Sequence, residues 1–202
     1  MELAACILAA GDGQRMGTPK ASLEIGGRTY LQFLLEAFRA AGITALFVAA
    51  RDPATHAPVC DAIGARLLVN PHPERGMLSS LHVCLEEVRN LPDVAGLFMT
   101  PVDCPLVRAT TIVRLATAFE TTNSPVVVPR HANRRGHPVL FAARVFDELR
   151  SAPLDRGARV VVGAHSSDLF EVEVTDAGIL DDVDTPADAA RLANTFLLQR
   201  KR

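Results

Sequence analysis

The glycine-rich segment at residues 8–20 contains the residue types that bind the phosphates of a nucleotide. It reads Leu-Ala-Ala-Gly-Asp-Gly-Gln-Arg-Met-Gly-Thr-Pro-Lys. Its three glycines let backbone N–H groups approach an anion without interference from a Cβ atom. Arg15 and Lys20 add two cations that are suited to a triphosphate. The segment therefore predicts a nucleotide-binding loop, and the alternative is a tight turn whose basic side chains face water.

Two common nucleotide-binding motifs do not fit this segment. A dinucleotide-binding loop has the spacing Gly-x-Gly-x-x-Gly, whereas the third glycine here, Gly17, comes one residue later. Pro19 also stands where the first turn of the phosphate-binding helix should run. A P-loop needs Gly-Lys-Ser or Gly-Lys-Thr after a four-residue spacer, which is missing. We therefore expect a nucleotide-binding loop of another type, and an NAD-dependent oxidoreductase is disfavoured.

Asp103 is a candidate metal ligand because of its place after an apolar strand. It follows the run at residues 96–100, and open α/β sheets bind ligands beyond the carboxyl ends of their strands. Mg²⁺ typically takes one or two carboxylates together with phosphate oxygens and water. The alternative is an aspartate that caps the turn before Pro105.

Other polar side chains could complete a site. Asn70 ends an apolar run, and its amide could contact a base or ribose, or form the turn before Pro71. Ser79 and Ser80 precede a helical pattern and could bind nucleotide or cap the helix. His137 lies in a polar loop with neighbouring arginines, which is either a phosphate-binding cluster or a solvated basic loop.

The elements that must position these residues follow an α/β pattern. Short apolar runs alternate with amphipathic helical patterns, which indicates a mostly parallel sheet that is covered on both faces. Strands are expected at residues 3–10, 45–50, 66–69 and 96–100, and helices at 30–41, 78–88 and 186–198. After residue 120 the pattern changes, and the runs at 125–129 and 138–141 indicate antiparallel content. We predict one Rossmann-like α/β/α domain of three layers over residues 1–202.

Composition limits the classes of partner. The chain has 202 residues, 49% of them hydrophobic, and a net charge of −2, so it has no general basic field for nucleic acid or an anionic membrane. No apolar run approaches the ~20 residues of a membrane span. The cysteines form no Cys-x-x-Cys pair, and we expect all four to be buried, reduced thiols of a cytoplasmic protein: Cys6, Cys60, Cys84 and Cys104.

Five segments together resemble the MobA-like nucleotidyltransferases. The first is Leu-Ala-Ala-Gly-x-x-x-Arg-Met-Gly-x-Pro-Lys, and one departure is Gly13, where the family often has serine. The others, in family order, are Asn-Pro…Gly-Met-Leu-Ser-Ser-Leu at 70–81, Pro-Val-Asp-Cys-Pro at 101–105, Gly-His-Pro at 136–138 and Asp-Val-Asp-Thr-Pro at 182–186. The resemblance implies a fold of the nucleotide-diphospho-sugar transferase type.

The resemblance also implies roles for individual residues. Catalysis would involve Arg15, Lys20 and Asp103. The nucleotide would be bound by Leu8, Ala9, Ala10, Gly11, Gly13, Arg15, Lys20, Asn70, Ser79 and Ser80. Mg²⁺ would be bound by Asp103 and Asp184, with Asp182 as the substitute for Asp184, although Asp-Thr-Pro is also a good helix N-cap. The acceptor would be bound by His137, Arg135 and Arg159, with residues 1–110 holding the NTP and residues 111–202 the acceptor.

The implied reaction is transfer of a nucleoside monophosphate from an NTP to a phosphorylated acceptor, with release of pyrophosphate. Leu-Ala-Ala-Gly resembles the cytidylyltransferase branch, so CTP is favoured, because Ala10 leaves less room for a purine than glycine does. The acceptor would be molybdopterin, and a molybdoenzyme is a possible partner. The alternatives are the same chemistry with GTP or with a sugar or alcohol phosphate, and a non-catalytic chaperone that binds nucleotide or molybdenum cofactor.

Overall fold

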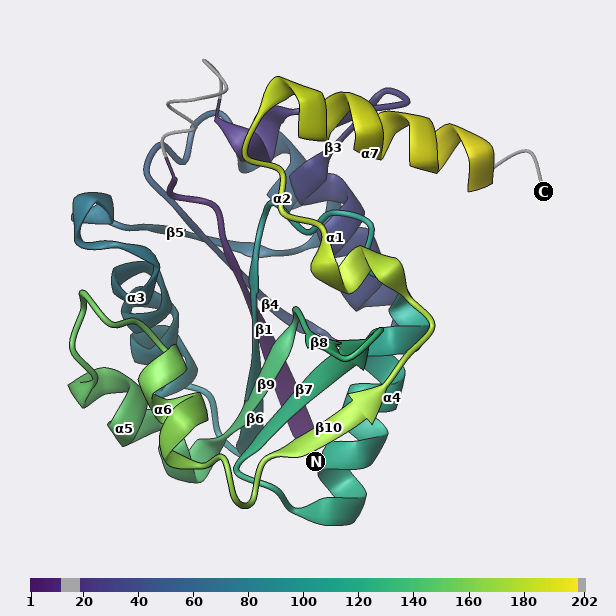
Figure 1. Ribbon diagram of the computed structural model, residues 1–202. Helices are drawn as coiled ribbons and strands as arrows, with labels where there is room; N and C mark the ends of the chain where they lie inside the picture. Colours follow the sequence, from purple (N-terminus) through teal and green to yellow (C-terminus); the bar gives the residue numbers. More distant parts are fainter. Residues whose placement is uncertain (12–18, 200–202) are drawn as a thin grey trace.

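β1 (Glu2–Leu8) is an interior strand of the main sheet, and almost every residue in it is apolar and buried. Its side chains alternate between the two faces: Leu3, Ala5 and Ile7 pack into one hydrophobic core, and Ala4 and Cys6 pack into the other. The strand therefore has a helical layer on each side. The computed structural model describes residues 1–11 and 19–199 (Figure 1).

The main sheet is largely parallel. The strand order is β10-β7-β9-β6-β1-β4-β5, and β8 pairs with β7. β1 pairs in parallel with both β4 and β6, β4 with β5, and β7 with β10. Within the described residues of this sheet, β8 and β9 run antiparallel to the strands beside them. The remaining strands are β4 (Ala45–Ala50), β5 (Arg66–Val69), β6 (Val94–Pro101), β7 (Val126–His131), β8 (Arg134–Arg135), β9 (Val139–Ala142) and β10 (Phe170–Glu173). The predicted parallel sheet with antiparallel content in the second half is confirmed.

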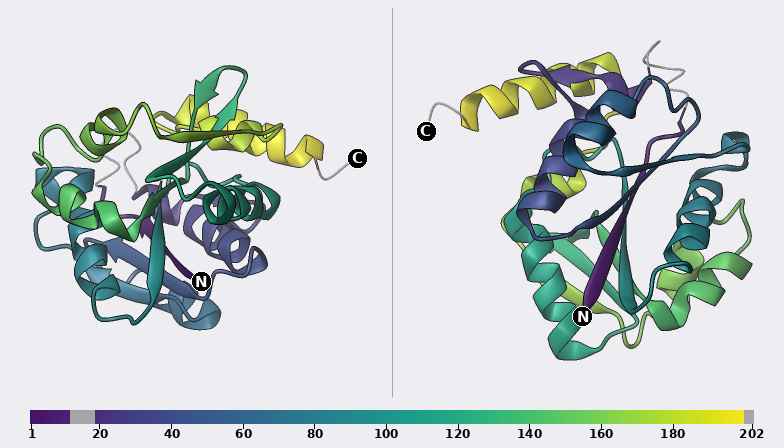
Figure 2. Two further views of the ribbon diagram at one scale, coloured as in Figure 1. Left: turned by 90° about the horizontal axis from the view of Figure 1, so that it is seen from below. Right: turned by 180° about the vertical axis from the view of Figure 1, so that it is seen from behind.

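The helices cover both faces, as two further views show (Figure 2). One core contains side chains of α1 (Tyr30–Ala40), α2 (Ala57–Ile63), α4 (Ala109–Thr122) and α7 (Pro186–Gln199). The opposite core contains side chains of α3 (Met77–Val88), α5 (Phe146–Ser151) and α6 (Arg159–Ala164). A small hairpin of β2 (Glu24–Ile25) and β3 (Arg28–Thr29) lies outside the main sheet. The three-layer prediction is thus confirmed.

The start of α7 shows which residue of the Asp-Thr-Pro sequence caps the helix. The Thr185 hydroxyl accepts a hydrogen bond from the Asp188 backbone N–H (3.2 Å), and the Asp188 carboxylate accepts one from the Thr185 N–H (3.0 Å). This reciprocal pair is a capping box. Thr185, and not Asp184, therefore caps α7.

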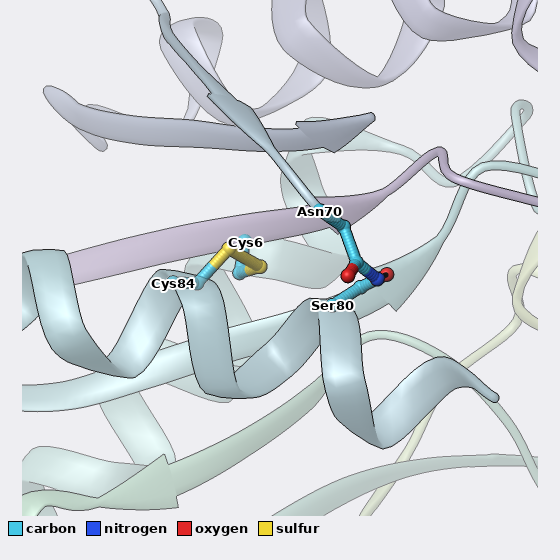
Figure 3. Close-up of a disulfide and its surroundings, with 4 residues drawn as sticks. All are labelled: Cys6, Asn70, Ser80 and Cys84. Carbon is cyan, nitrogen blue, oxygen red and sulfur yellow. Dashed lines mark hydrogen bonds between the residues drawn. A yellow bond between two sulfur atoms is a disulfide. The ribbon is translucent and has the colours of Figure 1, made fainter. Parts of the chain in front are cut away.

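The expectation that all four cysteines are reduced is wrong for two of them. Cys6 of β1 and Cys84 of α3 form a disulfide, while Cys60 and Cys104 are buried free thiols. Figure 3 shows the disulfide between the strand and the helix that packs over it. The two sulfur atoms meet because both side chains enter the same apolar layer, although 78 residues separate them in sequence. Among the described residues, no helix combines the length and apolar character that crossing a bilayer requires.

The disulfide predicts a count of reactive thiols. In denaturant without reductant, alkylation and mass spectrometry should find two modified cysteines, and four after reduction. Closing a loop of this length restricts the unfolded chain by about 4.5 kcal/mol in the entropic model, so Cys84→Ala should lower the free energy of unfolding in urea by several kcal/mol. Cys60→Ala is the matched control for loss of a buried thiol. Four modified cysteines before reduction would contradict the disulfide.

Candidate functional site

A cavity of about 420 Å³ lies at the carboxyl ends of β1 and β6. The parallel pairing of these strands brings Leu8 beside Pro101, and the residues that follow each strand then line the same hollow. Its walls include Leu8, Ala10, Gly11, Lys20, Pro73, Gly76, Met77, Ser80, Val102, Asp103, Asp182 and Asp184. This is the edge at which parallel α/β sheets bind ligands.

The Lys20 ammonium lies between two carboxylates in this cavity. Its Nζ atom is 3.0 Å from Oδ2 of Asp103 and 2.6 Å from Oδ1 of Asp184. Burial lowers the pKa of Lys20, but the hydrogen bonds to Asp184 and Asp103 outweigh burial, and the pKa lies above its ordinary value. Lys20 therefore stays protonated at neutral pH and compensates the charge of the acids.

A third carboxylate joins the pair. Carboxylate oxygens of Asp103, Asp182 and Asp184 all lie within 4.8 Å of one another. Burial, and then the charges of Asp103 and Asp184, raise the pKa of Asp182 above its ordinary value. Asp182 and Asp184 stand on either side of Val183, which is buried, and both acids line the cavity.

The arrangement is suited to a divalent cation. Hard cations such as Mg²⁺ and Mn²⁺ prefer carboxylate oxygens, and three of them converge here. The Lys20 ammonium already holds a positive charge between two of the acids. The donor set and this cation together show that the position is favourable for positive charge.

The side chains of Asn70 and Ser79 are buried in the protein and do not line the cavity. The Asn70 side chain is 2% exposed and donates hydrogen bonds from Nδ2 to the hydroxyls of Ser79 (2.8 Å) and Ser80 (2.9 Å). Its Oδ1 atom accepts one from the His72 backbone N–H (2.9 Å). Asn70 thereby ties the end of β5 to the first turn of α3, near the disulfide (Figure 3). Of the two serines, Ser80 lines the cavity.

The other residues of the glycine-rich segment divide into three groups. Leu8, Ala10 and Gly11 line the cavity. Ala9 packs into the core that contains side chains of α1, and its N–H donates to the Ala49 carbonyl (2.8 Å). Gly13 and Arg15 lie in residues 12–18, outside the described residues.

Two smaller cavities adjoin the first on the side predicted to hold the acceptor. One, of about 340 Å³, is lined by residues that include His137, Arg156 and Arg159. The other, of about 250 Å³, includes Arg134, Arg135 and His137, and it shares Asp103 and Asp182 with the main cavity. The structure thus brings the predicted acceptor residues to the two cavities beside the acids.

His137 and Arg135 are less suited to a phosphate than their residue types imply. Burial lowers the pKa of His137, so its imidazole is neutral at neutral pH. Its Nδ1 atom is buried and has no hydrogen-bond partner among the described residues. Arg135 is already paired with Glu171 at 2.7 Å. Arg134, which belongs to the basic loop around His137, and Arg156, which lies close to Arg159 in sequence, line the same cavities and form no ion pair within the described part of the chain.

The amino-acid sequence is similar to a known domain family and to curated relatives. The model of the MobA-like NTP transferase domain matches residues 5–169. A molybdenum cofactor guanylyltransferase of Rhizobium meliloti (strain 1021) is 32% identical over 196 residues, which is 90% of this chain and 86% of the relative.

Solved structures with a similar sequence have the same fold. The crystal structure of Rv0371c from Mycobacterium tuberculosis H37Rv superposes with a TM-score of 0.80 at 30% identity and covers 96% of this chain and 98% of that one. A structure of Rv0371c in complex with manganese superposes with a TM-score of 0.74 at 26% identity, covering 96% of this chain and all of that one (100%).

The cavity predicts opposite effects of two charge changes on metal binding. Mn²⁺ is titrated into the protein without nucleotide, and the electron paramagnetic resonance signal of the free ion gives the affinity. Asp103→Asn should bind Mn²⁺ about tenfold more weakly or worse, and a tenfold change corresponds to about 1.4 kcal/mol. Lys20→Met should strengthen binding, because it removes the competing ammonium. Asp93→Asn, at an exposed position away from the cavity, is the control. Equal affinities for all four proteins would contradict the assignment.

Proposed function

Because the chain belongs to the MobA-like NTP transferase family and is a nucleotidyltransferase, we propose that it transfers a nucleoside monophosphate from an NTP to the phosphate of molybdenum cofactor. The observation that carries the proposal is the group of Lys20 and the three acids in the 420 Å³ cavity. A guanylyltransferase that acts on this cofactor is among the relatives, which supports the choice of acceptor.

The reaction needs no nucleophilic side chain. An oxygen of the acceptor phosphate attacks the α-phosphorus of the NTP, a new P–O bond forms, and the bond between the α-phosphorus and the bridging oxygen breaks to release pyrophosphate. Such a displacement depends on positioning and on neutralising charge. The protein therefore has to hold two anionic molecules close together without repulsion.

The chain's own residues meet that requirement in distinct ways. Asp103, Asp182 and Asp184 would hold a divalent cation, Mg²⁺ in our proposal, which when bound neutralises phosphate oxygens and polarises the α-phosphate. The Lys20 ammonium would contact the triphosphate once it is freed from the acids, and Arg15 would add a second positive charge. Backbone groups of residues 8–11 and the Ser80 hydroxyl would orient the ribose and base.

The two cavities beside the acids would hold the acceptor. His137 is neutral and suits a hydrogen bond better than a charge pair with phosphate. Arg159, and with it Arg134 and Arg156, would contact the phosphate more readily than Arg135, whose guanidinium is already paired. Residues 1–110 would then provide most of the nucleotide site, and residues 111–202 would provide most of the acceptor site. Asp182 and Asp184 are the exception, because they belong to the second part of the chain but would contribute to the nucleotide site.

Two observations favour different bases. The relative that is 32% identical is named a guanylyltransferase, which favours GTP. Ala10 carries a methyl group at the wall of the cavity, which favours the smaller base of CTP. The three converging acids favour an enzyme over a chaperone that only binds cofactor, because binding alone does not need them.

An assay with the four NTPs tests the proposal. Purified protein, Mg²⁺ and molybdopterin-bearing molybdenum cofactor are incubated with each NTP, and pyrophosphate and the dinucleotide product are measured. We expect product with CTP or GTP, and competition between these two identifies the base. Lys20→Met and Asp103→Asn should lower kcat/KM at least 100-fold, which is about 2.7 kcal/mol, a magnitude typical of a lost electrostatic contact in a transition state.

Asp93→Asn serves as the control in this assay too, because it removes an acidic charge at an exposed position outside the cavity. If the protein binds nucleotide and cofactor but releases no pyrophosphate with any of the four NTPs, the proposed transfer reaction is contradicted. That result would support a chaperone that only binds the cofactor.

A further inference from the structure

Met77 is an exposed apolar residue at the junction of the three cavities. It is the first residue of α3, and 64% of its surface is exposed, although it is a large apolar side chain. Among the described residues, it alone lines all three cavities: the one with Lys20 and the acids, the one with Arg156 and Arg159, and the one with Arg134. Met77 thus lies where the proposed nucleotide and acceptor cavities meet.

The backbone beneath Met77 is held from the core side. Gly76 has φ 88°, a conformation that favours glycine, and its carbonyl accepts hydrogen bonds from the Ser79 N–H (3.1 Å) and hydroxyl (2.7 Å). Asn70 holds both Ser79 and Ser80, and Leu78 is buried. These contacts fix the first turn of the helix, so the Met77 side chain is presented at the junction by a rigid backbone.

The surroundings of Met77 indicate the chemistry of its ligand. On one side are a cation and carboxylates that suit a metal–triphosphate. On the other are three arginines that form no ion pair within the described residues, Arg134, Arg156 and Arg159, and these suit an anionic group such as phosphate. A thioether packs favourably against an aromatic ring, and this contact is worth roughly 0.3–1.5 kcal/mol beyond the area that it buries. An exposed thioether for a ring and nearby arginines for a phosphate together fit a ligand with a flat ring that carries a phosphate.

We propose that Met77 is a specificity-determining residue for the acceptor: its side chain packs against the ring system of a phosphorylated heteroaromatic acceptor and separates that ring from the nucleotide. The inference rests on the proposed function and deepens it. With the ring placed against Met77, the acceptor phosphate is left between the arginines and Asp103, the acid that lines both the main cavity and the one beside it.

Binding and kinetics of Met77 variants test this inference. The probe is molybdopterin, whose affinity is measured without nucleotide through its pterin fluorescence. Met77→Ala should weaken molybdopterin binding about tenfold and raise the KM for molybdopterin by a similar factor, while the KM for the NTP changes less than twofold. Met77→Leu keeps an apolar side chain of similar volume and should stay within about threefold of the unmodified protein in each quantity.

Two controls make the result specific. Val113→Ala removes an apolar side chain of α4 that is 44% exposed and lines none of the three cavities, and it should change neither constant. Thermal unfolding of each variant should match that of the unmodified protein, because Met77 is exposed. Unchanged molybdopterin affinity in Met77→Ala would overturn the inference, and so would a rise in the KM for the NTP alone, which would place the base against Met77.

The failure of this inference is distinguishable from the failure of the proposed function. If the unmodified protein binds molybdopterin but transfers no nucleotide, the proposed reaction is wrong, and the binding measurement still tests Met77. If the unmodified protein transfers nucleotide and Met77→Ala binds molybdopterin equally well, only the role of Met77 is wrong.

Discussion

The site depends on keeping three carboxylates close together, and positive charge between them offsets their mutual repulsion. Asp103, Asp182 and Asp184 place oxygens within 4.8 Å of one another, and the Lys20 ammonium contacts two of them. Like charges at this distance repel strongly in a partly buried site. The protein itself supplies a cation there, and a metal bound with a triphosphate could take its place while Lys20 turns to the phosphates.

The rest of the fold brings these groups together and holds the surfaces around them. Parallel pairing of β1 with β6 places the residues after both strands at one edge of the sheet. On the opposite side of the cavity, the first turn of α3 is fixed by Asn70 and the same helix is joined to β1 by the disulfide. The capping box of Thr185 and Asp188 starts α7 while leaving Asp184 directed at Lys20.

Much of this could be predicted from the sequence, because local patterns carry it. Continuous apolar runs identified the central strands, and an acid directly after one of them identified Asp103. The helices α2, α4, α5 and α6 were not predicted, since they are short or have weaker patterns. The disulfide and the contacts of Lys20 could not be predicted, because they join residues 78, 83 and 164 positions apart. Nor did the residue types show that Glu171 pairs with Arg135 or that burial keeps His137 neutral.

The most direct test of the cation site is a crystal structure with Mn²⁺ and a non-hydrolysable NTP, with the metal located by its anomalous scattering. We predict a manganese peak within about 2.3 Å of carboxylate oxygens of Asp103 and of Asp182 or Asp184, close to the 2.0–2.1 Å typical of the smaller Mg²⁺. The Lys20 ammonium should have left the acids for a phosphate oxygen. A nucleotide bound in the cavity with manganese away from these acids, or with Lys20 still between them, would contradict the account.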